Sequence, residues 1–132
     1  MGARASSCLA LAAYLLLSGC PQFCTCARFP YQLRINFLSW NSASGPLEGV
    51  VELSAQAPIH FACPGSGDSR VTCGESWMDL QFVGLAPDPA LLMTMTALRA
   101  GVSTTTSSTV SFSQTGSEAC CPIMSAEVLV DI

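Results

Sequence analysis

The segment that most constrains the fold is YQLRINF, residues 31–37, because apolar and polar side chains alternate at every position. In an extended chain, Tyr31, Leu33, Ile35 and Phe37 would share one face, and Gln, Arg and Asn would share the other. A two-residue period is typical of a strand that buries one side. The segment therefore predicts a β-strand whose apolar side faces a core.

Several other short segments have the same character. They are separated by turn-forming stretches such as NSASGP at 41–46 and PGSGDS at 64–69. The segments are VVELSAQA from 50, IHFAC from 59, RVTC from 70, WMDLQFV from 77, VSFS from 110 and AEVLVDI from 126. The pattern predicts a mainly β protein of about six short strands, packed as a small sandwich or an open barrel. We expect Trp77, at the start of one strand, to be partly buried beside Cys73, since aromatic residues supply much of a small core.

The segment DPALLMTMTALRAG, residues 88–101, also has features of a helix. Asp88 can cap a helix, Pro89 suits its first position and Gly101 can end it. A helix would place Leu91, Leu92, Met95 and Leu98 on one face. The alternation of Met and Thr at 93–96 equally suits a strand. We therefore expect at most one short helix, near residues 89–100.

A low-complexity run of hydroxyl residues, STTTSST, occupies residues 103–109. We expect it to form an exposed Ser/Thr-rich loop, with a Thr-rich edge strand as the alternative.

The first 27 residues have the layout of a secretory signal peptide. Arg4 precedes an apolar run at 8–17, and small residues follow. We expect a signal-like helix over this run and cleavage after Cys20 or Ala27, which would leave residues 28–132 as a single small domain. A buried N-terminal helix is the alternative. The apolar run is too short for a stable transmembrane span, which needs about 20 residues.

Two lipid-anchor motifs overlap the signal. LSGC at 17–20 resembles a bacterial lipobox, in which Cys20 would carry the lipid. MGARAS fits the myristoylation pattern, with Gly2 as the acylated residue. The expected location is therefore outside the cell, with a lipid-anchored surface protein as the alternative.

Eight cysteines are present, and four of them follow the longest predicted leader: Cys63, Cys73, Cys120 and Cys121. Secreted domains oxidise such sets to disulfides. Adjacent cysteines are poorly placed to bridge each other, so we expect Cys120 and Cys121 each to bond a distant partner, namely Cys63 or Cys73. A local Cys63–Cys73 bond is the alternative.

The charged residues argue against several functional classes. The chain has 132 residues, a net charge of −4 and no lysine, and its five arginines are scattered. A nucleic-acid surface would need clustered cations, and a phosphate-binding loop would need its lysine. The cysteine spacings and the single histidine, His60, do not match a zinc motif. His60 is expected to face water, and we predict no catalytic residue, metal or cofactor.

These features favour a small secreted, disulfide-stabilised protein that binds an extracellular protein partner and performs no catalysis. The charged fraction, 11%, is low for a soluble domain. A second reading is therefore an orphan reading frame without an evolved biochemical function, which would not fold cooperatively.

Overall fold

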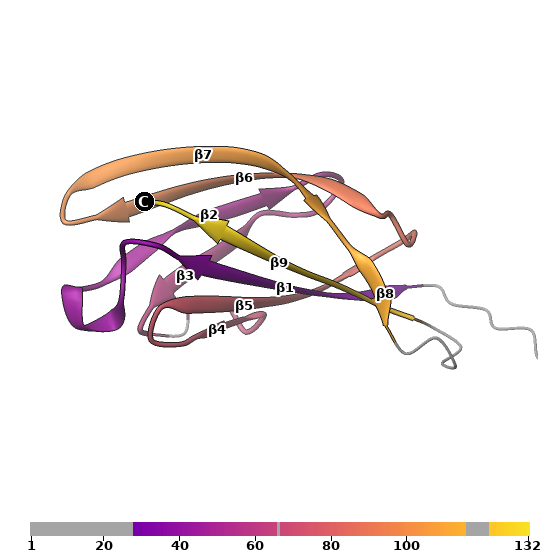
Figure 1. Cartoon of the computed structure of the whole chain (residues 1–132), viewed down its shortest axis with the longest axis horizontal. Coiled ribbons are helices and arrows are strands. Elements are labelled where there is room, and N and C mark those ends of the chain that lie inside the picture. The colour runs from indigo at the N-terminus through magenta and orange to yellow at the C-terminus, as the bar shows by residue number, and fades with distance from the viewer. Residues whose placement is uncertain (1–27, 66, 116–121) are drawn as a thin grey trace, which may run out of the picture.

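The computed structural model describes residues 28–65, 67–115 and 122–132, and these residues form two packed β-sheets (Figure 1). The strands in chain order are β1 (Phe29–Phe37), β2 (Leu47–Leu53), β3 (Ile59–Cys63), β4 (Val71–Cys73), β5 (Trp77–Gly84), β6 (Ala90–Arg99), β7 (Val102–Ser111), β8 (Ser113–Thr115) and β9 (Ile123–Val130). A single 3₁₀ turn, η1 (Ser42–Ser44), lies between β1 and β2. The prediction of a mainly β protein is confirmed, and of the two expected packings, a sandwich or an open barrel, the two sheets form a sandwich.

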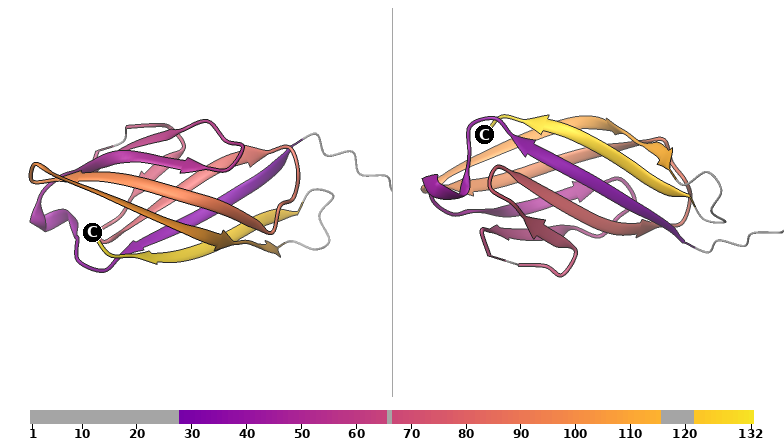
Figure 2. Two further views of the ribbon diagram at one scale, coloured as in Figure 1. Left: turned by 90° about the horizontal axis from the view of Figure 1, so that it is seen from above. Right: turned by 60° about the horizontal axis from the view of Figure 1, so that its bottom comes forward.

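The chain builds the sandwich from hairpins that alternate between the two layers (Figure 2). The hairpins β2–β3 and β6–β7 form a four-stranded sheet with the order β3-β2-β6-β7. The hairpins β4–β5 and β8–β9 join β1 in a five-stranded sheet with the order β4-β5-β1-β9-β8. Each of the first three hairpins is therefore followed by a crossing to the opposite layer.

Strand β1 lies inside the five-stranded sheet and pairs on both sides. It runs antiparallel to β5, with Leu33 opposite Leu80, and parallel to β9, with Leu33 opposite Ala126. Its apolar positions are buried in the alternation that the sequence predicts, and Leu33 and Ile35 are almost wholly inaccessible to water.

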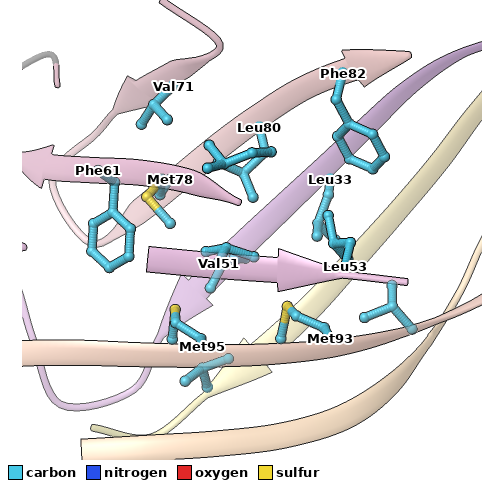
Figure 3. Close-up of a cluster of buried hydrophobic side chains, with 14 of the residues drawn as sticks. Leu33, Val51, Leu53, Phe61, Val71, Met78, Leu80, Phe82, Met93 and Met95 are labelled. Carbon is cyan, nitrogen blue, oxygen red and sulfur yellow. The ribbon is translucent and has the colours of Figure 1, made fainter. Parts of the chain in front are cut away.

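The core lies between the sheets and is made of side chains from both layers. In Figure 3, Val51, Phe61, Met93 and Met95 of the four-stranded sheet point towards Leu33, Met78, Leu80 and Phe82 of the other. Four buried methionines, at 78, 93, 95 and 124, contribute flexible side chains that fill irregular space. No polar or charged side chain is buried among the residues described, so the core needs no internal polar network.

Aromatic rings close one end of the sandwich. Tyr31 stacks on Phe82 at a centroid distance of 5.0 Å, and Phe112 meets Tyr31 edge-on at 5.1 Å. The Tyr31 hydroxyl donates a hydrogen bond to the Ala86 carbonyl and accepts one from the Asp88 backbone N–H. Phe112 separates β7 from β8, at the point where the chain passes from one sheet to the other.

The expectation of a helix near 89–100 is wrong, because residues 90–99 form strand β6. The strand buries Leu91, Met93, Met95 and Ala97 against the core and turns the alternate side chains outward. Gly101 does not end a helix. Together with Ala100 it forms a two-residue hairpin turn, in which both residues have positive φ, 52° and 78°.

The expectation of a Ser/Thr-rich loop at 103–109 is also wrong, since these residues lie within β7, the edge strand of the four-stranded sheet. This is the edge-strand alternative. The β-branched threonines suit an extended backbone, and β7 pairs with β6 along its whole length. Because residues 90–111 supply two further strands, the described chain has more strands than the six expected.

The strand assignment of β6 makes a sharp prediction about two neighbouring apolar residues. Met93 is completely buried, whereas Leu92 on the opposite face is 56% exposed. Met93→Ala should lower the free energy of unfolding by about 2–5 kcal/mol, and Leu92→Ala should change it by about 0.5 kcal/mol or less. Urea denaturation of both variants measures these changes. A larger loss of unfolding free energy in Leu92→Ala than in Met93→Ala would contradict the strand and favour a helix.

Candidate functional site

Two of the predicted disulfide cysteines bond to each other. Cys63 at the end of β3 is linked to Cys73 in β4, with their Cα atoms 5.6 Å apart. β3 is an edge strand of the four-stranded sheet and β4 is an edge strand of the five-stranded sheet. The disulfide therefore joins the two layers of the sandwich along one side, and its Cys63 end is buried.

This pairing contradicts the expectation that Cys63 and Cys73 would each bond to Cys120 or Cys121, and it is the local alternative. Only a short turn separates β3 from β4, so the two cysteines already meet at a distance that suits a disulfide. Cys120 and Cys121 lie outside the described residues. So do the predicted signal peptide at 1–27 and the predicted lipidation positions, Gly2 and Cys20.

The disulfide predicts a clear peptide map, because the chain has no lysine and Arg70 lies between the two cysteines. After reduction, trypsin should release residues 35–70, 71–99 and 100–132 as three separate peptides. Without reduction, 35–70 and 71–99 should remain joined by the disulfide, and 100–132 should be released separately. Linkage of 100–132 to either of them would contradict the pairing.

The same disulfide should contribute to stability. It closes a loop with a sequence separation of 10 residues, for which chain entropy alone gives about 3 kcal/mol. The double variant Cys63→Ala/Cys73→Ala should lose about this much free energy of unfolding relative to the oxidised chain.

The main candidate binding surface is a shallow groove on the outer face of the four-stranded sheet. Its volume is about 490 Å³, and it crosses β3, β2 and β6 and reaches Ser103 at the start of β7. The groove is lined by Glu48, Gly49, Val50, His60, Phe61, Ala62, Gly67, Thr96, Leu98 and Ser103. His60 is exposed there, as the sequence predicts. The other lining residues were missed, because a groove across three strands depends on lateral pairing that no local pattern contains.

Glycines allow the backbone to pack closely at this groove. A Cβ atom built on Gly49 would lie 2.0 Å from the carbonyl oxygen of Thr96, so a side chain at this position would force β2 and β6 apart. Gly67 has a φ of 58° and lies against β3, where its Cβ would be 3.0 Å from the Ala62 nitrogen. Both positions therefore favour glycine on steric grounds.

An ion pair holds the turn beside the groove. The Arg70 side chain and backbone N–H donate hydrogen bonds to the Asp68 carboxylate, the shortest at 2.6 Å. The side-chain hydrogen bond from Arg70 is the main reason that the pKa of Asp68 falls to about 2. Both carboxylate oxygens are bonded to Arg70, so Asp68 is committed to this turn and not to orienting His60 as a base.

The ion pair predicts a pH dependence. The folded pKa of Asp68 lies below its ordinary value of 3.8, so the pair stabilises the fold above about pH 4, and this contribution is lost as the pH falls towards 2. A carboxyl-carbon NMR titration should show Asp68 titrating near 2 in the native chain and near its ordinary value in Arg70→Gln. Equal titration in both proteins would contradict the assignment.

The outer face of the five-stranded sheet carries a second polar cluster. Arg34 donates two hydrogen bonds to Asp79, at 2.7 and 2.8 Å, and its guanidinium carbon lies 4.0 Å from the centroid of the Trp77 ring. Trp77 is half-buried, as predicted, and its ring covers Gly74, next to Cys73. The Arg34–Asp79 pair borders a hollow of about 210 Å³.

Residues 28–65, 67–115 and 122–132 contain no cluster of three or more histidine, cysteine or acidic side chains placed to hold a metal ion. In the same part of the chain, no helix has the length and hydrophobicity needed to cross a bilayer.

Comparison of the chain with models of protein families, with curated proteins and with solved structures found no match. We therefore infer its function from the geometry of this chain.

Proposed function

We propose that the chain is a small secreted, disulfide-stabilised β-sandwich that acts as an extracellular binding module, with the groove over β3, β2 and β6 as its contact surface for a protein partner. The observation that carries this proposal is the composition of the groove. Val50 and Leu98 offer apolar area, and the polar side chains of Glu48, His60 and Thr96 alternate with them across the three strands. Protein interfaces typically combine apolar contact area with polar groups that can form hydrogen bonds.

Secretion is supported by two independent features. The Cys63–Cys73 disulfide joins the two sheets, and structural disulfides persist mainly in oxidising compartments. The N-terminal residues have the composition of a secretory leader. A lipid-anchored surface protein, modified at Cys20 or Gly2, would expose the same groove outside the cell.

The experiment uses the chain recovered from the medium of expressing cells. Its mass should show the loss of residues up to Cys20 or Ala27, and an intact N-terminus would contradict export through a cleaved leader. The recovered protein is then tested for saturable binding against a panel of secreted and cell-surface proteins.

Two leucines on the outer face of β6 provide a matched pair of variants for this binding test. Leu98 lines the groove and is 41% exposed, whereas Leu92 lies outside it and is 56% exposed. Leu98→Arg should weaken binding at least about tenfold and Leu92→Arg by no more than about twofold. Equal effects, or no saturable ligand in the panel, would contradict the proposed surface.

Denaturant unfolding distinguishes the proposed binding module from the alternative of an orphan reading frame. A module with this core and disulfide should unfold in one cooperative transition that moves to lower denaturant on reduction. A broad transition that reduction does not move would favour a frame without an evolved fold.

A further inference from the structure

Strand β7 is a long edge strand that has no pairing partner on its outer side among the described residues. Of the four edge strands in the described part of the two sheets, β4 and β8 have three residues each and β3 has five, whereas β7 has ten. Soluble proteins commonly protect long edges with lysine, proline or inward charges. β7 contains none of these, since its sequence is VSTTTSSTVS.

The direction of the free backbone groups in β7 follows from its pairing with β6. The two-residue turn makes Arg99 and Val102 the closing pair, and the Phe112 N–H bonds to the Pro89 carbonyl at 2.7 Å in the same register. Backbone bonding alternates along an antiparallel pair. The even-numbered residues of β7 therefore bond to β6, and Ser103, Thr105, Ser107 and Thr109 direct their N–H and C=O groups to the open edge.

The sequence of β7 is nearly symmetric about Thr106. Residues 102–110 read VSTTTSSTV, so an antiparallel second copy centred on Thr106 would place valine opposite valine and hydroxyl opposite hydroxyl at every position. In this register Ser103 faces Thr109 of the second copy, and Thr105 faces Ser107. All four residues belong to the set whose backbone groups point outward, so the symmetric register is also one that the hydrogen-bonding pattern permits.

The side chains of β7 already form this kind of contact within the sheet. The hydroxyls of Thr94 and Ser107 lie 3.0 Å apart, and those of Thr96 and Thr105 lie 3.2 Å apart, across the β6–β7 pair. Cross-strand hydroxyl pairs of this type stabilise antiparallel sheets. The second copy would continue the same ladder on the other side of β7, without bringing like charges together. It would also place an apolar neighbour opposite Val102, which is 63% exposed.

We propose that the partner of this edge is a second copy of the same chain, bound by antiparallel β7–β7 pairing about a two-fold axis at Thr106. The two four-stranded sheets would then become one continuous sheet across the dimer. The contact is isologous, since the same strand serves both copies, and it closes on itself instead of propagating into a fibre. The β7 edge meets the groove only at Ser103, and the pairing does not depend on the partner proposed for the groove.

The test measures the mass of the secreted chain by sedimentation over a range of concentrations. The native protein should form dimers, and a protein that stays monomeric at every concentration would overturn the proposal. Thr106 is the informative position, because it would face its own copy at the axis. Thr106→Lys and Thr106→Glu should each dissociate at least about ten times more readily than the native chain, through like-charge repulsion. An equimolar mixture of the two variants should form mixed dimers, since opposite charges then meet.

A second pair of variants tests the backbone contact separately. Ser107→Pro removes an N–H that points to the free edge, and proline is tolerated on that side of an edge strand. It should abolish the dimer, whereas Ser107→Ala, which keeps the N–H, should retain dimers. A dimer that persists in Thr106→Lys, Thr106→Glu and Ser107→Pro would place the interface elsewhere and overturn the proposal. If Ser107→Pro does not fold, the equimolar mixture of Thr106→Lys and Thr106→Glu still tests the β7–β7 pairing.

Discussion

The placement of β1 between β5 and β9 is the constraint on which the rest of the structure depends. β1 is nearest the beginning of the described chain and β9 is nearest its end, yet the two pair in parallel over residues 31–37 and 124–130. A parallel pair cannot be closed by a tight turn, so the whole intervening chain acts as the connection. That intervening chain supplies the opposite sheet, and β1 and β9 contribute Leu33, Ile35, Met124 and Val130 to the core between the layers.

The two sides of the sandwich are secured in different ways. On one side the edge strands β3 and β4 are short and are joined across the layers by Cys63–Cys73. On the other side the chain passes from β7 to β8 through Phe112, whose ring packs against Tyr31 and Phe82. A covalent link therefore holds one side, and the aromatic packing at one end of the sandwich anchors the crossing from β7 to β8. The long edge of β7 is left available, and this asymmetry is the structural basis for proposing self-association there.

The surface chemistry follows from the low charge of the chain. The described residues contain two ion pairs, Arg34–Asp79 and Asp68–Arg70, and each is partly exposed and locally satisfied. Exposed pairs of this kind contribute little to global stability. Their effect is to order side chains on the faces of the sheets, where Arg34 lies over Trp77 and Arg70 holds the turn beside the groove. The surfaces proposed for binding therefore consist of hydroxyl, apolar and isolated polar groups, and they carry few charges.

The sequence by itself determined the β class and the inward residues of most strands, because a two-residue period is a local property of the extended chain. Tyr31, Leu33, Ile35 and Phe37 are examples, as is the outward placement of His60. It also identified Cys63 and Cys73 as disulfide candidates. Tertiary structure decided the matters that depend on distant neighbours. Residues 90–99 have both a helical face and an alternating pattern, and the core of the opposite sheet selects the strand by burying Met93 and Met95. β7 is extended because β6 lies beside it, the cysteines pair locally because β3 and β4 end at the same side, and the groove exists only where three strands are brought together.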